Sequence, residues 1–263
     1  MKTLKVSKGG DEITSVDAWH KYAPPKEENK HWKDGRSAKE LAKAWFPDDS
    51  GQPTVPAELT QLLESCLLTQ GLTFREAWPE YITRLDSFKG EHRNADLVIL
   101  ADSAKGKFLL SIEAKADETF GKPIVDRLND VKNNPKSKIL ERISLLTKAI
   151  FGKTIEEDPA IGSLYYQLLT GVAGTLIEAR NQKADYAIFI VHEFVSKECC
   201  TDDNLSCNKN AMIDFIDHLK TEGKSSTAFD GKLAGRFKVF GNESVPSNIH
   251  FYIGKIRRCL DKK

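Results

Sequence analysis

Three ionisable residues lie within two short hydrophobic segments of the sequence, where a protein core is expected. Asp96 begins the apolar run that reaches Leu100, and Glu113 and Lys115 end the run of residues 108–115. Because side chains alternate along a strand, Glu113 and Lys115 project from one face while their apolar neighbours project from the other. Burying a charge costs several kcal/mol unless the charge is paired or binds a metal ion. The spacing therefore indicates a functional site.

This set of residues suits the hydrolysis of a phosphodiester with the help of a divalent cation. The neighbouring carboxylates of Asp96 and Glu113 offer the hard oxygen ligands that Mg²⁺ or Mn²⁺ prefers. Such an ion acidifies a water and polarises a phosphoryl oxygen, and the Lys115 ammonium orients the attacking water. We therefore expect Asp96, Glu113 and Lys115 to be catalytic, with the two carboxylates as metal ligands.

The elements that would position these residues follow from hydrophobic periodicity. Apolar residues at three-and-four spacing predict a core helix over about residues 56–69. Three short apolar segments separated by turn residues predict an antiparallel meander. The continuous apolar run of residues 185–191 is typical of a central strand covered on both faces. The meander strands are expected at residues 81–88, 96–101 and 107–115; further helices are expected near residues 16–22, 37–46, 123–131, 137–150, 161–182 and 209–221, and further strands near residues 236–240 and 248–255. The expected fold class is mixed α/β.

An acidic residue on one strand followed by Glu-x-Lys on the next resembles the core of the PD-(D/E)XK nuclease superfamily. The residues that carry the resemblance are Asp96 and Glu113-Ala114-Lys115. It implies a restriction-endonuclease-like core of a helix, a three-stranded antiparallel meander, a helix and a strand, an order similar to that expected over residues 56–194. It also implies that Asp96, Glu113 and the Ala114 carbonyl bind Mg²⁺ or Mn²⁺ and that Lys115 positions or activates the attacking water. The sequence departs from the motif at Ala95, which stands where a proline would precede the aspartate.

The same resemblance suggests further site residues. Gln167 lies on the long predicted helix, where superfamily members often carry a catalytic glutamine, and a core hydrogen bond is its alternative role. Glu64 lies on the first core helix, where some members place another metal ligand; Glu58 is its equal rival, and a solvated side chain is the alternative. Glu118 follows the catalytic strand, either supporting the metal ligands or serving the loop. Two runs, Glu118-Thr119-Phe120 and Tyr166-Gln167-Leu168-Leu169, are similar to those of an uncharacterised bacterial branch of the superfamily.

Charge and motif content limit the other functions. The sequence has 39 Lys and Arg and 38 Asp and Glu, a net charge of +1, so contact with nucleic acid requires a local basic surface. Lys105 and Lys107 in a predicted hairpin, and Lys132, are candidates for that surface. The sequence contains no Gly-rich phosphate loop, nucleophile elbow or His-Glu-x-x-His motif, which argues against a nucleotide-driven motor, a serine hydrolase and a zincin.

The length of 263 residues suits one large domain or two small ones. Residues 1–34 are expected to form a flexible or extended N-terminal segment, residues 35–55 a helical extension, and residues 56–263 the nuclease-like domain. No apolar stretch follows the basic residues at the N-terminus, so we expect no signal peptide, a cytoplasmic location and no contact with a membrane. The uncharged stretch of residues 159–177 is too polar for a membrane span and is expected to form a buried helix.

The function expected from this reasoning is that of a metal-dependent endonuclease acting in restriction, phage defence or repair. Fold-level analogy favours DNA as the substrate, with RNA as the alternative. A homodimer would match the two-fold symmetry of a duplex, and a regulatory or recognition partner is a further expectation. Two other functions stay open: a non-catalytic binding subunit with a nuclease fold, and a cytoplasmic interaction or immunity-type protein in which the Glu-x-Lys is coincidental.

Overall fold

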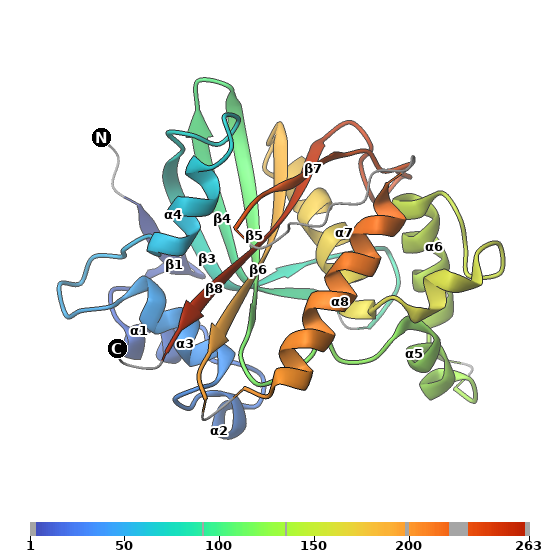
Figure 1. The fold of residues 1–263 in the computed structure, drawn as a ribbon, viewed down its shortest axis with the longest axis horizontal. Coiled ribbons are helices and arrows are strands. Elements are labelled where there is room, and N and C mark those ends of the chain that lie inside the picture. Colours follow the sequence, from blue (N-terminus) through green and yellow to red (C-terminus); the bar gives the residue numbers. More distant parts are fainter. Residues whose placement is uncertain (1–3, 91, 135, 198–199, 221–230, 261–263) are drawn as a thin grey trace.

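One mixed sheet forms the centre of the protein in a computed structural model that describes residues 4–90, 92–134, 136–197, 200–220 and 231–260 (Figure 1). The strands are β1 (Lys5–Lys8), β2 (Asp11–Glu12), β3 (Thr73–Thr83), β4 (Arg93–Ser103), β5 (Gly106–Lys115), β6 (Tyr186–Val195), β7 (Ala234–Phe237) and β8 (His250–Cys259). Their order in the sheet is β2-β1-β3-β4-β5-β6-β8-β7. Strands β3, β4 and β5 form an antiparallel meander, whereas β6 and β8 run parallel to β5. The fold class is therefore mixed α/β, as the sequence predicted.

Helices cover both faces of this sheet and create two hydrophobic cores. The helices are α1 (Val16–Tyr22), α2 (Glu28–His31), α3 (Ser37–Trp45), α4 (Ala57–Glu64), α5 (Ile124–Val131), α6 (Ile139–Phe151), α7 (Tyr166–Asn181) and α8 (Asp202–Leu219). Helix α7 packs on β4, β5 and β6, and the buried side chains of α6 and α8 join the same core. Helices α1, α3 and α4 bury their apolar side chains in the core on the opposite face.

Strand β5 carries the predicted catalytic residues and alternates between the two cores. Leu109 packs in the α7 core, whereas Leu110 and Ile112 pack in the opposite core. The same alternation directs Glu113 and Lys115 toward α7. Because β5, β6 and β8 are parallel, their carboxyl ends meet at one edge of the sheet, where antiparallel β4 begins. The fold thus brings the start of β4 and the end of β5 to the same place.

The first strand of the meander lies earlier in the chain than the sequence predicted. The prediction was residues 81–88, whereas β3 spans Thr73–Thr83. Pro79 weakens the strand pattern, because proline has no N–H for a sheet hydrogen bond. The sheet tolerates Pro79 because β1 pairs with β3 only at Glu76 and Ala77, which leaves the later part of that side of β3 without a partner strand. The other two meander strands contain the predicted residues.

The N-terminal residues belong to the sheet and its core. The sequence predicted a flexible or extended segment over residues 1–34 and, over residues 35–55, a helical extension that covers one side of the sheet. The first segment instead joins the sheet and its core, because β1 pairs with β3 and Val6, Ile13 and Trp19 are buried. Helix α3 packs against β5 and β6. The helices near residues 16–22 and 37–46 were predicted, but β1 and β2 were not, because a short polar strand needs only one or two buried side chains to join a core.

The uncharged stretch of residues 159–177 forms a short 3₁₀ helix, Pro159–Ser163, followed by most of α7. The residues of α7 that follow Gln167, up to Ala179, are all buried, so the expectation of a buried helix is confirmed. Among the residues that the structure describes, no helix is long and apolar enough to cross a membrane.

Candidate active site

Glu113 lies at the centre of a buried ionic cluster at the carboxyl end of β5. The residue is only 2% exposed. Gln167 Nε2 donates a hydrogen bond to Glu113 Oε1 at 2.6 Å, and Lys115 Nζ lies 2.9 Å from the same oxygen. The guanidinium of Arg93, at the start of β4, binds Glu113 Oε2. Both carboxylate oxygens therefore accept hydrogen bonds, and two of the three partners are cationic.

Lys115 and Gln167 also contact each other, which closes a triangle with Glu113. Lys115 Nζ donates to Gln167 Oε1 at 3.0 Å. The same ammonium lies 5.4 Å from the centre of the Phe120 ring, on its face. Since Gln167 uses its oxygen for the lysine and its amide nitrogen for the glutamate, it fixes the positions of both side chains. The sequence predicted Glu113, Lys115 and Gln167 as one catalytic group, and the structure brings them together.

Two glycines in α7 let the helix approach the sheet closely enough to make these contacts. A Cβ at Gly171 would lie 2.8 Å from the Phe189 ring, and a Cβ at Gly174 would lie 2.9 Å from the Arg93 side chain. Both distances are too short for carbon atoms, so only glycine fits without a shift. Gly174 thereby makes room for Arg93 between α7 and the sheet.

Asp96 lies beside Glu113 where β4 and β5 diverge. The last paired residues of the two strands are Leu97 and Ile112, and one further step in this register places Asp96 opposite Glu113. Asp96 Oδ2 accepts a hydrogen bond from the Ala114 N–H at 2.7 Å, so the side chain satisfies a backbone group that the ladder no longer pairs. Burial and the nearby charges of Glu113 and Glu80 raise the pKa of Asp96 well above its usual range.

Glu80 adds a third carboxylate that the sequence did not predict. Its backbone has a φ of 50°, a left-handed conformation that non-glycine residues seldom adopt. The amide of Asn94 binds its side chain, and Lys8 Nζ donates to its carbonyl oxygen at 2.6 Å. Burial, together with the negative charge of Glu113, raises the pKa of Glu80 to about 7. A glutamate in a strand with polar neighbours carried no signal in the sequence for this position.

The three carboxylates therefore differ in how tightly they hold a proton. Burial alone would raise the pKa of Glu113, but the positive charges of Arg93 and Lys115 outweigh burial and lower it. Asp96 and Glu80 lie near this negative charge and have raised pKa values. An additional cation would relieve the repulsion among the three groups. This is the electrostatic character expected of a site that accepts a metal ion.

The residues present fit Mg²⁺ or Mn²⁺ that shares its coordination with a substrate. In the part of the chain that the structure describes, no group of three or more His, Cys, Asp and Glu side chains could hold a metal ion by itself. Mg²⁺ is commonly bound by only one or two carboxylates together with waters and substrate phosphates. Asp96 and Glu113 can supply such a pair, and half-buried Asp96 is reachable from solvent.

The structure separates Glu64, a predicted metal ligand, from this site. Helix α4 packs on the sheet face opposite α7, and Glu64 Oε1 accepts a hydrogen bond from the Gly71 N–H at 3.1 Å. Its rival Glu58 lies on the same helix and binds His192 and Arg258. The apolar stripe of α4 indicated which side of the helix is buried, but it could not indicate which face of the sheet the helix would cover.

Glu118 lies near the cluster without joining it. Its carbonyl oxygen accepts a hydrogen bond from Asn208 Nδ2 of α8 at 3.0 Å, which fixes the loop that follows β5. The half-buried carboxyl group is close enough to feel the charge of Lys115. Burial and contact with Asp117 raise its pKa despite that positive charge. The position agrees with a supporting role behind Lys115.

The three lysines predicted to contact nucleic acid lie away from the cluster. Lys107 begins β5, about 20 Å along the strand from Glu113, and its Nζ donates to the Gln182 carbonyl at 2.8 Å. Lys105 lies in the adjoining turn, where it binds the Leu67 carbonyl. Lys132 is exposed after α5 and lines a different pocket, of about 460 Å³. The hairpin places the first two lysines at the end of β5 opposite Glu113 and Lys115.

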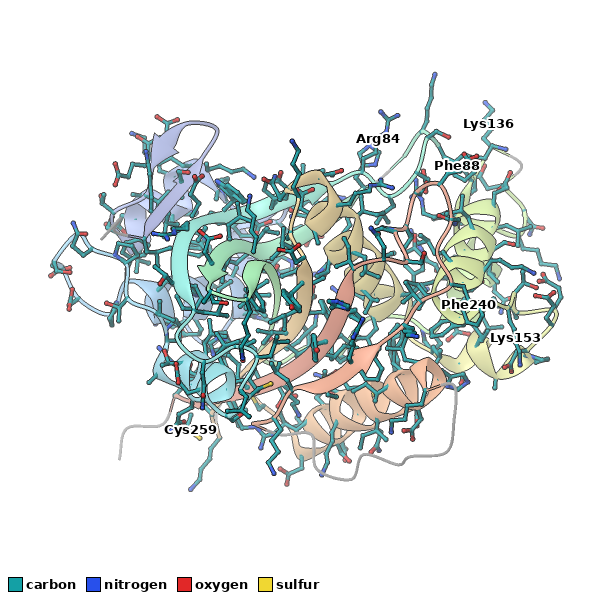
Figure 2. The ribbon with its side chains drawn as sticks, turned by 90° about the horizontal axis from the view of Figure 1, so that it is seen from above. Arg84, Phe88, Lys136, Lys153, Phe240 and Cys259 are labelled. Atoms are coloured by element: carbon teal, nitrogen blue, oxygen red, sulfur yellow. The ribbon has the colours of Figure 1, made fainter. Side chains whose placement is uncertain are left out.

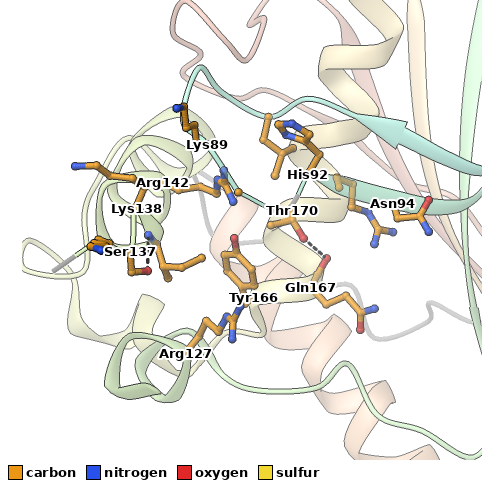
Figure 3. Close-up of a pocket in the computed structure, with 15 residues that line it drawn as sticks. Lys89, His92, Asn94, Arg127, Ser137, Lys138, Arg142, Tyr166, Gln167 and Thr170 are labelled. Carbon is orange, nitrogen blue, oxygen red and sulfur yellow. Dashed lines mark hydrogen bonds between the residues drawn. The ribbon is translucent and has the colours of Figure 1, made fainter. Parts of the chain in front are cut away.

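A basic pocket of about 520 Å³ adjoins the ionic cluster (Figure 3). Three segments form it, namely the connection from β3 to β4, the region from α5 to α6, and the first turn of α7. The residues of this basic pocket are Leu85, Lys89, Gly90, His92, Arg93, Asn94, Arg127, Lys136, Ser137, Lys138, Ile139, Arg142, Tyr166, Gln167 and Thr170. Arg93 and Gln167 belong to both the pocket and the cluster. No local sequence pattern predicts this pocket, because its segments are far apart in the chain.

Comparison with known proteins identifies one matching family. A family profile described as "Domain of unknown function (DUF6946)" matches residues 12–259. No curated protein and no solved structure matches the chain.

Proposed function

The chain belongs to the DUF6946 family, and from this premise we propose that it is a metal-dependent nuclease that hydrolyses phosphodiester bonds, with DNA as the preferred substrate. The observation that carries the proposal is the buried triangle of Glu113, Lys115 and Gln167 beside Asp96. A structural ion pair needs one acid and one base. Here, two further carboxylates face the pair, and the group borders a pocket rather than closed core.

The order of elements supports the restriction-endonuclease-like core as the finer description of the fold. Helix α4 precedes the antiparallel meander β3–β4–β5, and α7 then leads to β6, which lies parallel to β5. The candidate residues occupy the second and third meander strands and the helix that follows. The same order was expected from the resemblance to the PD-(D/E)XK superfamily.

Asp96 and Glu113 would hold the metal ion, with the Ala114 carbonyl as a further oxygen donor. When bound, Mg²⁺ or Mn²⁺ supplies a Lewis acid that polarises a phosphoryl oxygen and acidifies an attacking water. Glu113 stays ionised because Arg93 and Lys115 lower its pKa. Asp96 must release its proton to act as a ligand, and half-buried Asp96 can pass that proton to solvent.

Lys115 has the geometry to orient the nucleophile. An ammonium has three N–H donors, and within the described residues Lys115 uses two of them, for Glu113 Oε1 and Gln167 Oε1. The third donor remains for a water or a phosphoryl oxygen. Because two hydrogen bonds fix the ammonium, the water that it binds has a defined position, and the positive charge offsets charge that develops on the phosphoryl group.

Cleavage assays with matched lysine variants test this proposal. We expect wild-type protein to cut supercoiled plasmid, single-stranded DNA or RNA in Mg²⁺ or Mn²⁺ and not in EDTA. Glu113→Gln and Lys115→Gln should each lower the rate at least about 10²-fold. Lys107→Gln is the control, since it makes the same change at the far end of the same strand and should stay within about threefold of wild type. Equal activity of Lys115→Gln and Lys107→Gln would overturn the proposal.

One observation favours a non-catalytic binding subunit as the second candidate. The guanidinium of Arg93 already binds Glu113 Oε2, an oxygen that a metal ion would need. If wild-type protein binds neither Mg²⁺ nor Mn²⁺ in calorimetry and cuts none of the three substrates, this alternative replaces the nuclease.

A further inference from the structure

The basic pocket carries more positively charged side chains than are needed to pair with the ionic cluster beside it. Six Lys and Arg side chains and one His line it, and no Asp or Glu is among its lining residues. Lys89 and Lys136 have no acidic partner among the residues that the structure describes. Arg127 Nη1 lies 3.9 Å from Asp130 Oδ2, at the outer limit of an ion pair. Arg93, Lys138 and Arg142 pair with acids outside the lining, namely Glu113, Glu141 and Asp86, so Lys89, Lys136 and the loosely paired Arg127 carry the excess positive charge of the pocket.

Two buried nitrogen atoms of the pocket have no hydrogen-bond partner within the described residues. They are Arg93 Nε and His92 Nδ1. Arg93 is 8% exposed, so water replaces the missing acceptor poorly. Buried polar groups are normally paired, and a group left unpaired frequently awaits a ligand. An anion bound in the pocket could supply an acceptor for such a group.

The shape of the pocket limits the anion to a small group. A volume of about 520 Å³ accommodates a phosphate or one nucleotide, whereas a duplex needs an extended groove. Tyr166 lies between Arg127 and Arg142, and Lys138 and Ser137 approach from another side (Figure 3). The Arg127 guanidinium lies 5.9 Å from the centre of the Tyr166 ring. Guanidinium groups bind phosphate oxygens in a fixed fork, which gives such a pocket selectivity for phosphate.

A second pocket lacks this character although it is larger. It has a volume of about 810 Å³ and lies along β1, β3, β4 and β5 at the end of β5 far from Glu113. There, Arg75 Nε binds Asp102 Oδ2 at 2.9 Å, and Glu76 is a further lining residue. Two acids, Glu76 and Asp102, therefore offset most of the charge of its three cations, Lys5, Arg75 and Lys107. Excess positive charge distinguishes the basic pocket from this one.

We propose that the basic pocket binds a phosphate group of a nucleic-acid strand, and that an adjacent phosphodiester of the same strand reaches Lys115. That the phosphate belongs to a nucleic-acid strand rests on the proposed function, whereas the binding of a phosphate group rests on the pocket alone. Arg93 and Gln167 line the pocket and also contact Glu113, so a strand held in the pocket continues directly to the ionic cluster. The bound group is either a terminal phosphate monoester or an internal diester, because the same basic side chains would bind the oxygens of both.

Binding without metal tests this site independently of cleavage. The probes are 12-nucleotide single strands of DNA and RNA with a 3′ fluorescein and either a 5′ phosphate or a 5′ hydroxyl, measured by anisotropy in EDTA at several salt concentrations. The variants are Lys89→Gln and Lys136→Gln, both exposed and therefore unlikely to disturb folding, with unchanged circular dichroism as a check. Lys153→Gln is the matched control, because Lys153 is an exposed lysine elsewhere on the surface (Figure 2).

We expect each pocket variant to weaken binding about 3–10-fold and to reduce the salt dependence by roughly 0.7 in the slope of log K against log salt, as for one lost phosphate contact. Lys153→Gln should stay within about twofold of wild type. A wild-type preference for the 5′ phosphate that the pocket variants lose identifies the terminal monoester. Equal binding of both strands, weakened by the same variants, identifies an internal diester.

Two results would overturn the inference. One is no binding of any of the strands by the wild-type protein, and the other is equal binding by Lys136→Gln, Lys89→Gln and Lys153→Gln. Different results would disprove the inference and the proposed function. Phosphate-dependent binding in a protein that cuts nothing keeps the pocket and removes the nuclease, whereas cleavage that the pocket variants leave unchanged keeps the nuclease and removes the pocket.

Discussion

The Glu113 and Glu58 clusters, in each of which basic side chains surround a glutamate, balance their charges differently. At the first, Glu113 faces Arg93 and Lys115, but Asp96 and Glu80 add negative charge. The second lies on the opposite face of the sheet, where Glu58 of α4 meets the ends of β6 and β8. Both clusters join residues far apart in the chain, so topology alone does not separate a functional group from a structural one.

The Glu58 cluster is electrically satisfied. Arg258 donates to both Glu58 oxygens, from Nε at 2.7 Å and from Nη2 at 3.1 Å. His192 Nε2 lies 2.8 Å from Glu58 Oε1. Although burial acts to raise it, these partners lower the pKa of Glu58 to about 2. Burial lowers the pKa of His192, which favours the neutral ring. The cluster therefore has little electrostatic demand for a further ion.

The Glu113 cluster has the opposite property. The pKa values of Asp96 and Glu80 are raised, so the folded protein pays a free-energy cost to ionise them. Such a cost is typical of sites that bind a charged ligand. The Glu113 cluster also adjoins the basic pocket. Glu58 has a lowered pKa and paired oxygens, as a structural group would, whereas the raised pKa values of Asp96 and Glu80 beside Glu113 fit the proposed cation site.

The largest effect that separates the two clusters is on cleavage. Under the proposed function, Asp96→Asn should reduce the metal-dependent cleavage rate at least about 10²-fold, because it removes the charge of a proposed metal ligand while keeping the size of the side chain. Glu58→Gln should leave the rate within about threefold, measured well below its melting temperature. The measurement is plasmid or oligonucleotide cleavage under single-turnover conditions. Equal losses in both variants would contradict the distinction between the clusters.

The sequence was sufficient to predict the residues that share one strand. The alternation of apolar and charged residues in β5 directs Glu113 and Lys115 to one face, and this depends only on the period of a strand. Asp96 followed from the short hairpin that joins β4 to β5, because a hairpin fixes the register of its strands. Gln167 came from the resemblance, since its helix position alone did not identify its contacts.

The rest of the site depends on contacts that no local pattern encodes. Arg93 reaches Glu113 only because Gly174 lets α7 lie close to β4. Glu64 was misplaced because an amphipathic helix packs equally well on either face of a sheet covered on both sides. Strand β1 was missed because it has four residues and gains its hydrogen bonds from β3, about 70 positions later. Each case requires tertiary packing.

The second prediction concerns the stability that the Glu58 cluster contributes. Glu58→Gln should lower the free energy of unfolding by about 2 kcal/mol at pH 7, because Arg258 and His192 lose a charged acceptor. This corresponds to a melting temperature lower by roughly 4–8 °C. The folded-state pKa of Glu58 lies below its unfolded value, so the contribution is complete above about pH 4.5 and is lost as the pH falls toward about 2. Thermal unfolding between pH 2.5 and 7 measures it.

If the difference between Glu58→Gln and wild type stays constant across that pH range, the stabilisation comes from packing and not from charge. The loss of stability in Asp86→Asn is the reference for the size of the effect, since Asp86 also forms a buried ion pair, with Arg142.

The third prediction concerns the pH dependence of metal affinity. Glu80 has a pKa of about 7, so raising the pH from 6 to 8 adds a negative charge beside Glu113. Ionisation of Asp96 acts in the same direction. Mn²⁺ affinity measured by calorimetry should therefore rise about tenfold over this interval. Glu80→Gln should flatten the rise near pH 7, and Glu58→Gln should retain it. An affinity that is independent of pH in wild-type protein would show that neither carboxyl group faces the ion.

The smallest effect is an increase in stability. The folded-state pKa of Asp96 lies above its unfolded value, so the folded chain binds more protons than the unfolded chain from about pH 4 up to the raised pKa. The contribution of Asp96 to the stability of the metal-free wild type therefore falls as the pH rises through this window. Asp96→Asn removes the repulsion from Glu113 and Glu80, and its amide oxygen can still accept from the Ala114 N–H. The variant should be more stable at pH 7 by about 1 kcal/mol, a rise of roughly 2–4 °C in melting temperature.

Thermal unfolding in EDTA from pH 4 to 8 measures the gain, which should shrink toward pH 4. A pH-independent loss of stability would instead assign Asp96 to the Glu58 type of cluster, as a structural cap on the diverging end of β5.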